Sequence, residues 1–101
     1  MTGNKTSSRR QHMKALPQTG ETIARLLELA DLTEGQLAQL IEVDPSSIRY
    51  WVEGKRSPGY APIFKIARLL NVSSDFFGTG LPEGFEIDAA AVTTAHEKLG
   101  A

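Results

Sequence analysis

The sequence predicts an all-α fold, a compact bundle of about five short helices. Apolar residues recur at spacings of three and four along most of the chain, and no segment alternates apolar and polar residues as a half-buried strand would. Capping residues, Gly and Pro separate the periodic segments. A chain of 101 residues has room for one such domain and a tail.

The first helix is predicted to begin at Thr19, because one helix face then carries the apolar residues Ile23, Leu26, Leu27 and Ala30. A second helix is predicted over about residues 34–41. Thr33 and Gln36 have the spacing of a capping box at its start. Its predicted buried face consists of Leu37, Ala38, Leu40 and Ile41.

The third helix is predicted from Pro45 to Glu53, with Gly54 after its end. Asp44 is suited to cap it, and proline is tolerated at the first helical position because its missing N–H would have no partner there. The apolar face of this helix consists of Ile48, Trp51 and Val52. We therefore expect Trp51 in the core.

A fourth helix is predicted to open at Pro62 and to close near Asn71, with Phe64 in the core beside Ile63, Ile66, Ala67 and Leu70. Ser73 can cap a short fifth helix through Phe77. Residues 88–99 are a weaker candidate, with Asp88 as cap and a thin apolar stripe of Ala91, Ala95 and Leu99. His96 is expected to lie in solvent beside Glu97.

Charge divides the chain into three parts. Residues 1–18 are predicted to be a flexible arm, and residues 1–20 carry +4 from Lys5, Arg9, Arg10 and Lys14. The helical domain is expected over residues 19–78, and residues 21–74 sum to −1. Residues 79–101 are expected to be an acidic tail for dimerisation or partner binding, and residues 75–101 sum to −4. The arm has an alternative interpretation as a cloning remnant or a solubilising leader.

Composition excludes several classes of protein. Apolar residues make up 41% and charged residues 23% of the chain, as in soluble globular proteins. The chain has no cysteine, no apolar run of membrane-spanning length and no secretion signal, so we expect a cytoplasmic protein without a metal or other cofactor. Because no nucleophile, metal site or phosphate loop is assembled, we expect no enzymatic activity.

The second and third helices are separated by only a few residues, which is helix-turn-helix spacing. The sequence resembles the XRE family of lambda-repressor-like and Cro-like domains over residues 19–77. The resemblance is carried by Leu32-Thr33, Leu37-Ala38, Val43, Ser47-Ile48, Trp51, Gly54-Lys55-Arg56, Pro58 and Asn71-Val72-Ser73.

This resemblance implies a reading helix that begins at Pro45. With Ile48, Trp51 and Val52 buried, helical spacing turns Ser46, Arg49 and Tyr50 outward, where similar proteins read bases. Arg49 is the strongest candidate, because a guanidinium can grip guanine O6 and N7 together. The alternative is that Arg49 and Tyr50 only solvate an exposed helix.

Contacts with the DNA backbone are expected from Ser47, Lys55 and Arg56, which lie on or just after the reading helix. The arm residues Arg9, Arg10 and Lys14 could reach the duplex as well. Lys65 and Arg68 are expected to face solvent.

The sequence departs from the family pattern in four ways. Glu34 stands where relatives carry a phosphate-binding Gln, and Glu42 stands where they often carry a Gly with a left-handed backbone, so Glu42 either changes the turn or strains it. Pro45 has no N–H to offer a base. Leu27 and Val52 replace a buried Arg–Glu pair of relatives, which predicts that these two side chains touch.

The expected function is that of a sequence-specific, double-stranded DNA-binding transcriptional regulator in a prokaryotic cell or an infected host, associated with the nucleoid. A repressor that binds a palindromic operator as a homodimer is the simplest form. Dimer contacts could come from Phe76, Phe77, Leu81, Phe85 and Ile87, unless these seal the domain's own core. The alternative function is a protein-interaction module, such as an antitoxin or antirepressor, acting through the acidic tail.

Overall fold

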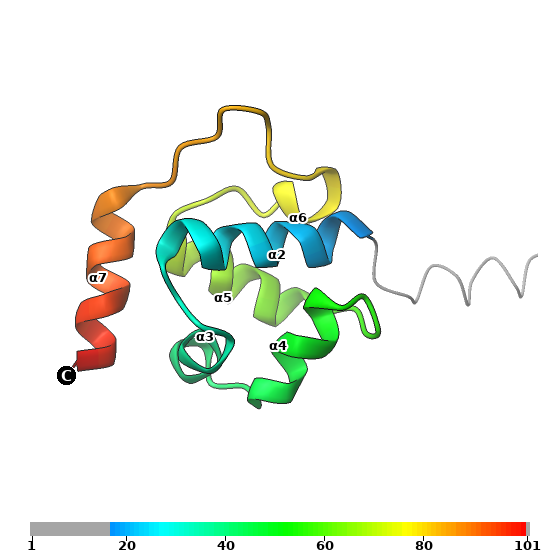
Figure 1. The fold of residues 1–101 in the computed structure, drawn as a ribbon, viewed down its shortest axis with the longest axis horizontal. Helices are drawn as coiled ribbons and strands as arrows, with labels where there is room; N and C mark the ends of the chain where they lie inside the picture. Colours follow the sequence, from blue (N-terminus) through cyan, green and yellow to red (C-terminus); the bar gives the residue numbers. More distant parts are fainter. Residues whose placement is uncertain (1–16, 101) are drawn as a thin grey trace, which may run out of the picture.

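A computed structural model describes residues 17–100 and is all-helical within that range, as the sequence predicts (Figure 1). The arm residues Lys5, Arg9, Arg10 and Lys14 lie outside the described residues. The helices are α2 (Pro17–Ala30), α3 (Glu34–Ile41), α4 (Pro45–Val52), α5 (Tyr60–Leu70), α6 (Phe76–Thr79) and α7 (Ala89–Gly100).

The helix α2 contacts both α4 and α6. It begins at Pro17, two residues before the start that the apolar pattern predicts. The hydroxyl of Thr19 donates a hydrogen bond to the Phe77 carbonyl oxygen (2.6 Å), and the Thr22 hydroxyl donates to that of Phe76 (3.0 Å). These two buried threonines satisfy carbonyl groups of α6 and attach it to α2.

The core contains the predicted apolar faces of α2, α3 and α4. Its fully enclosed side chains include Ile23, Leu26, Leu37, Ile41 and Ile48. Trp51 is buried as predicted, whereas Leu40 and Val52 are only half-buried against the cluster. Leu27 is buried in the same cluster, and direct contact between Leu27 and Val52 stays a prediction.

The expectation that Phe64 is a core residue is wrong. Its side chain is 51% exposed and stacks on Tyr60, which is 80% exposed, with ring centroids 6.0 Å apart. The buried face of α5 is formed by Ile66, Ala67 and Leu70. Phe64 precedes Ile66 by two positions, a rotation of about 200° around the helix, so it points away from that face.

The start of α5 also differs from the prediction, since the helix begins at Tyr60 rather than at Pro62. Pro62 is its third residue, and the N–H groups of the first helical turn have no partner inside the helix. The first helical hydrogen bond runs from the Ile63 N–H to the Gly59 carbonyl oxygen (3.4 Å). A proline at the third position therefore removes no helical hydrogen bond.

The apolar residues after α5 cover the domain's own core. Phe77 is buried, Leu81, Phe85 and Ile87 pack half-buried against the core, and the Phe76 ring meets Phe85 edge-on at 5.6 Å. These side chains therefore pack on the domain's own core, and their role in dimer contacts stays a prediction.

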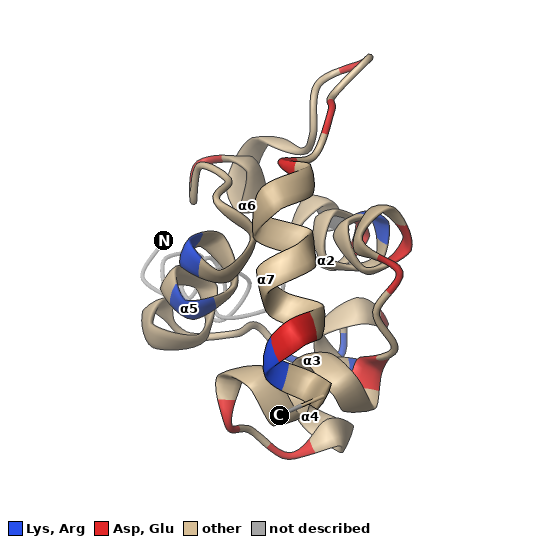
Figure 2. Cartoon of the chain, turned by 90° about the vertical axis from the view of Figure 1, so that its left-hand side faces the viewer, with Lys and Arg blue, Asp and Glu red and all other residues tan. Residues whose placement is uncertain are grey.

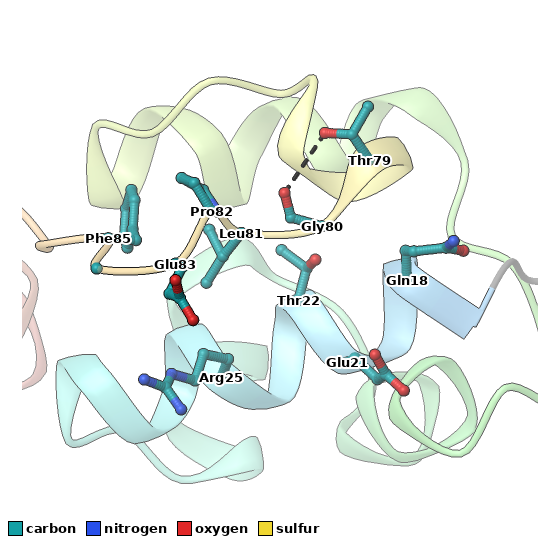
Figure 3. Close-up of a pocket in the computed structure, with 11 residues that line it drawn as sticks. Gln18, Glu21, Thr22, Arg25, Thr79, Gly80, Leu81, Pro82, Glu83 and Phe85 are labelled. Carbon is teal, nitrogen blue, oxygen red and sulfur yellow. Dashed lines mark hydrogen bonds between the residues drawn. The ribbon is translucent and has the colours of Figure 1, made fainter.

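An open pocket lies between α2 and the segment after α6 (Figure 3). Glu21 and Arg25 from α2 and Glu83 from the segment are among the side chains that line it. Within the described residues, no buried side-chain nitrogen or oxygen lacks a hydrogen-bond partner, so this pocket offers no orphaned polar group to a ligand.

The segment after α6 arches away from the body and returns as α7, which packs against α3 and α5 (Figures 1 and 2). Asp88 caps α7 by accepting hydrogen bonds from the N–H groups of Ala90 (2.9 Å) and Ala91 (3.2 Å). Ala95 is completely buried, so the core extends past residue 78.

His96 is not the solvated residue that its neighbour Glu97 suggested. It is half-buried, and its Nε2 lies 2.8 Å from the carbonyl oxygen of Ala30, the last residue of α2. Carbonyl groups at a helix end lack partners inside the helix, and the imidazole N–H supplies one. This contact joins the far end of α2 to α7.

The turn between α3 and α4 keeps a left-handed residue although it has no glycine. Glu42 has φ 61° and ψ 50°, and its N–H donates to the Ala38 carbonyl oxygen at the end of α3. Of the two outcomes considered for Glu42, the structure contains the strained backbone. The cost of this conformation for a residue with a Cβ is about 1–2 kcal/mol.

Replacing Glu42 with Gly should raise the free energy of unfolding by up to about 1 kcal/mol, because the relieved strain exceeds the backbone entropy that glycine loses. Thermal unfolding measures this as a higher Tm. The control is Gln39→Gly on the exposed side of α3, which should lower stability by about 1 kcal/mol. A lower Tm for Glu42→Gly would contradict the assignment of strain.

The close approach of α2 to α4 depends on Gly20. A Cβ at this position would lie 2.7 Å from the carbonyl oxygen of Trp51 and 2.8 Å from that of Val52. Both neighbours are backbone atoms, so neither can move aside as a flexible side chain would.

Gly20→Ala should therefore destabilise the domain by about 1–3 kcal/mol despite alanine's higher helix propensity. Urea unfolding measures the loss. Gly35→Ala is the matched control, because its Cβ would meet only the Thr33 Oγ1 at 4.0 Å, and it should be neutral or stabilising. Equal stability of the two variants would contradict the close contact at Gly20.

Candidate nucleic-acid interface

The helix α4 turns one side into the core and the other away from it. Ile48 and Trp51 are buried, while Ser46, Arg49 and Glu53 are exposed. Tyr50 and Ser47 are half-buried at the edges of the outer side. The outward direction predicted for Ser46 and Arg49 is confirmed, and Tyr50 is less exposed than the spacing alone suggests.

The start of α4 is held by Asp44. Its Oδ1 accepts a hydrogen bond from the Ser46 N–H (2.9 Å) and another from the Ser46 hydroxyl (2.7 Å). Pro45 takes the first helical position, as predicted. Since the Ser46 hydroxyl donates its only proton to Asp44, its oxygen is left with acceptor capacity for a ligand.

Arg49 does not point freely into solvent. Its Nη2 lies 3.1 Å from Oε1 of Glu34, the first residue of α3, and its Nη1 lies 3.9 Å from Oε2 of Glu53. The Arg49 side chain is still 63% exposed, against 31% for Glu34. The ion pair spans an open groove between the starts of α3 and α4, lined by Thr33, Glu34, Gly35, Pro45, Ser46 and Arg49.

The loop after α4 folds back on this helix. The N–H groups of Lys55 and Arg56 donate to the Tyr50 carbonyl oxygen (2.8 and 3.3 Å). The Arg56 guanidinium stands over the Tyr50 ring, 4.9 Å from its centroid, and the Lys55 Nζ lies 3.2 Å from Oε1 of Glu53. Both predicted backbone-binding cations are therefore held beside the outer side of α4.

Two of the three cations on or just after α4 form ion pairs with acidic residues. Arg49 is paired with Glu34 and lies 3.9 Å from Glu53, and Lys55 is paired with Glu53. The sequence singles out Glu34 as a departure from the family but does not reveal its partner Arg49, because the pairing depends on the angle between α3 and α4. The i,i+4 spacing of Arg49 and Glu53 was a signal that could have been used.

Other cations of the described part lie away from this groove. Lys65 and Arg68 are on α5 and Lys98 is on α7 (Figure 2). Lys65 and Arg68 are exposed as predicted, and the Lys65 Nζ also donates to the carbonyl oxygen of Ile41 at the end of α3 (3.2 Å). A cation at this place stabilises the helix end.

Residues 17–100 contain neither a membrane-spanning helix nor a candidate metal site. None of the helices in that range has the length and apolar content needed to cross a membrane. The same residues contain no group of three or more His, Cys, Asp or Glu side chains that could hold a metal ion.

The two hydrogen bonds from Ser46, the backbone N–H first and the hydroxyl second, hold the pKa of the Asp44 carboxyl below its usual range. Because the folded-state pKa is lowered, the capping contribution is present above the unfolded pKa of about 3.9 and is lost as the pH falls through the folded value. An NMR titration of the Asp44 carboxyl carbon should therefore have its midpoint below about 3.9.

Ser46→Ala removes only the hydroxyl, so the Asp44 midpoint should rise while staying below the usual value. Asp88 is the internal control, because the Asn71 side chain and the Ala91 N–H lower its pKa independently of Ser46. An Asp44 midpoint that does not move in Ser46→Ala would show that the hydroxyl contact is absent in solution.

Comparisons with known proteins agree with this geometry. A helix-turn-helix family model matches residues 23–77, more than half of the chain. A crystal structure of a transcriptional regulator from Listeria innocua is similar, with a TM-score of 0.58 and 22% sequence identity, over 82% of this chain and 76% of that one. No curated protein matches the sequence. The family match includes the whole of α3 and α4, and the chain belongs to the XRE family of helix-turn-helix proteins.

Proposed function

We propose that this protein is a DNA-binding transcriptional regulator that recognises a specific duplex sequence, and that it represses transcription by occupying a palindromic operator as a dimer. The orientation of α4 is the observation that carries the proposal. Its apolar side is held in the core, and its polar side, with Ser46 and Arg49, faces outward. An α-helix presented in this way fits the major groove.

In this proposal Arg49 reads the sequence. A guanidinium has five N–H donors, and the contacts of Arg49 with Glu34 and Glu53 leave other donors for the O6 and N7 atoms of a guanine. Ser46 can accept a hydrogen bond from a base amino group, and Tyr50 can contribute its hydroxyl.

The DNA backbone would be bound from both sides of the reading helix. Lys55 is 67% exposed, and Arg56 on the Tyr50 ring is exposed as well. Ser47 and the arm residues Arg9, Arg10 and Lys14 complete the proposed set. Such contacts orient the domain without reading bases.

Dimer formation is proposed because one short helix contacts few base pairs, and a two-fold partner doubles the site. The apolar residues at the end of the domain are used in its own core. Leu81, Phe85 and Ile87 are only half-buried there, so their exposed parts remain the proposed dimer contacts. The proposed location of this regulator is the nucleoid.

A second candidate function is that of a protein-interaction module, such as an antitoxin or antirepressor. The ion pairs of Arg49 with Glu34 and of Lys55 with Glu53 favour it, because a cation that is already paired attracts phosphates weakly. The acidic residues of the C-terminal segment, Glu83, Glu86 and Glu97, are exposed for such a partner. A protein of this kind would show little of the salt-dependent affinity for DNA that phosphate contacts produce.

Selection of bound duplexes from a random pool tests the proposed function. The expected result is a palindromic consensus. Arg49→Ala should lose discrimination at one base pair in each half-site, by about 1–3 kcal/mol. Repeating the selection with this variant measures the loss.

Lys55→Ala is the matched control. It should weaken binding to all duplexes alike and reduce the salt slope by about one, because it removes a phosphate contact. A pool without any enriched sequence would exclude the proposed function. A consensus of a single half-site would exclude the dimer.

A further inference from the structure

Glu34 lies at the N-terminus of α3, where a helix attracts anions through its free N–H groups and its dipole. The start of this helix in a helix-turn-helix faces the DNA backbone. A carboxylate at this position repels the phosphates that the helix end would otherwise attract. The capping box of Thr33 and Gln36 already stabilises the start of this helix. Helix stability therefore does not explain why a glutamate stands at this position.

The contact of Glu34 with Arg49 provides that explanation. Oε1 of Glu34 and Nη2 of Arg49 are 3.1 Å apart across the groove between α3 and α4. Both groups are partly exposed, so the pair lies on the surface that would meet DNA. Nη1 of Arg49 lies 3.9 Å from Oε2 of Glu53. The Glu53 carboxylate is closer to Lys55, whose Nζ lies 3.2 Å from Oε1. Glu34 is thus the main partner of the guanidinium.

We infer that Glu34 is a specificity-determining positioning residue, which holds Arg49 so that the guanidinium can bind a neutral base edge but does not move to a phosphate. The inference rests on the proposed function. It concerns the choice between two acceptors that Arg49 would meet on DNA.

The two acceptors differ in charge. Guanine O6 and N7 are neutral, so Arg49 can donate to them while its charge stays balanced by Glu34. A phosphate is an anion, and bringing it to a guanidinium paired with Glu34 places two anions around one cation. Glu34 therefore disfavours the phosphate contact and tolerates the guanine contact.

This difference in charge between the two acceptors matters on duplexes in which another base replaces the guanine. Where the guanine is replaced, an unrestrained Arg49 could turn to a nearby phosphate and recover part of the lost binding. An Arg49 held by Glu34 recovers nothing, so the full penalty for the wrong base is kept. The cost is a weaker attraction to DNA in general.

The test compares the wild type with Glu34→Gln on the selected consensus duplex and on a duplex changed only at the base pair that Arg49→Ala identifies. For the wild type, this change should weaken binding about tenfold or more. For Glu34→Gln the penalty should fall to about threefold or less, and the salt slope on the changed duplex should steepen by about one as Arg49 gains a phosphate. Fluorescence anisotropy at several salt concentrations measures both.

Glu86→Gln is the matched control, because it removes the same charge from the exposed segment between α6 and α7 (Figure 1). It should keep the wild-type penalty. Glu34→Gln in the Arg49→Ala background should change no base preference, since Glu34 acts through Arg49. Circular dichroism verifies that each variant is folded.

The outcomes separate this inference from the proposed function. If Glu34→Gln tightens binding to both duplexes equally, Glu34 acts only by repulsion and the inference is wrong, while the regulator remains. An unchanged penalty and salt slope would overturn it too. If the wild type itself binds all duplexes alike, the proposed function fails and the inference fails with it.

Discussion

The close approach of α2 to the end of α4 is the constraint on which the rest of the structure depends. Gly20 lets the backbones meet so closely that a Cβ atom would lie 2.7 Å from the Trp51 carbonyl oxygen. Because backbone atoms form this contact, side-chain rotamers do not alter the direction of α4. Trp51 and Ile48 then enter the core, and the opposite side of the same helix faces outward with Arg49.

The same helix α2 organises the C-terminal part of the chain. At one end the hydroxyls of Thr19 and Thr22 bind carbonyl groups of α6, and at the other end the Ala30 carbonyl oxygen accepts from His96 of α7. Each contact joins α2 to a helix that lies far from it in the sequence, and the one from His96 supplies a partner for a carbonyl group at a helix end. The helix-turn-helix is thus supported by segments distant in sequence, and its outer side remains free of them.

Local signals predicted most of the helices correctly. The capping box of Thr33 and the cap by Asp44 involve residues within three positions of each other, so their spacing is visible in the sequence. The prediction for His96 was wrong because its partner, the Ala30 carbonyl oxygen, belongs to another helix. A histidine next to an acid in the sequence does not reveal a contact of that kind. The prediction for Phe64 was wrong although helical spacing alone turns this residue away from the buried face of Ile66, Ala67 and Leu70.

The sequence by itself determined that residues 17–100 are helical, where α4 begins, and that Ser46 and Arg49 lie on its outer side, because periodicity and capping act within a few residues. Only the tertiary structure decided that Arg49 is paired with Glu34, fifteen positions earlier and on another helix. That pairing depends on the crossing of α3 and α4, which is set by the packing of both helices in the shared core.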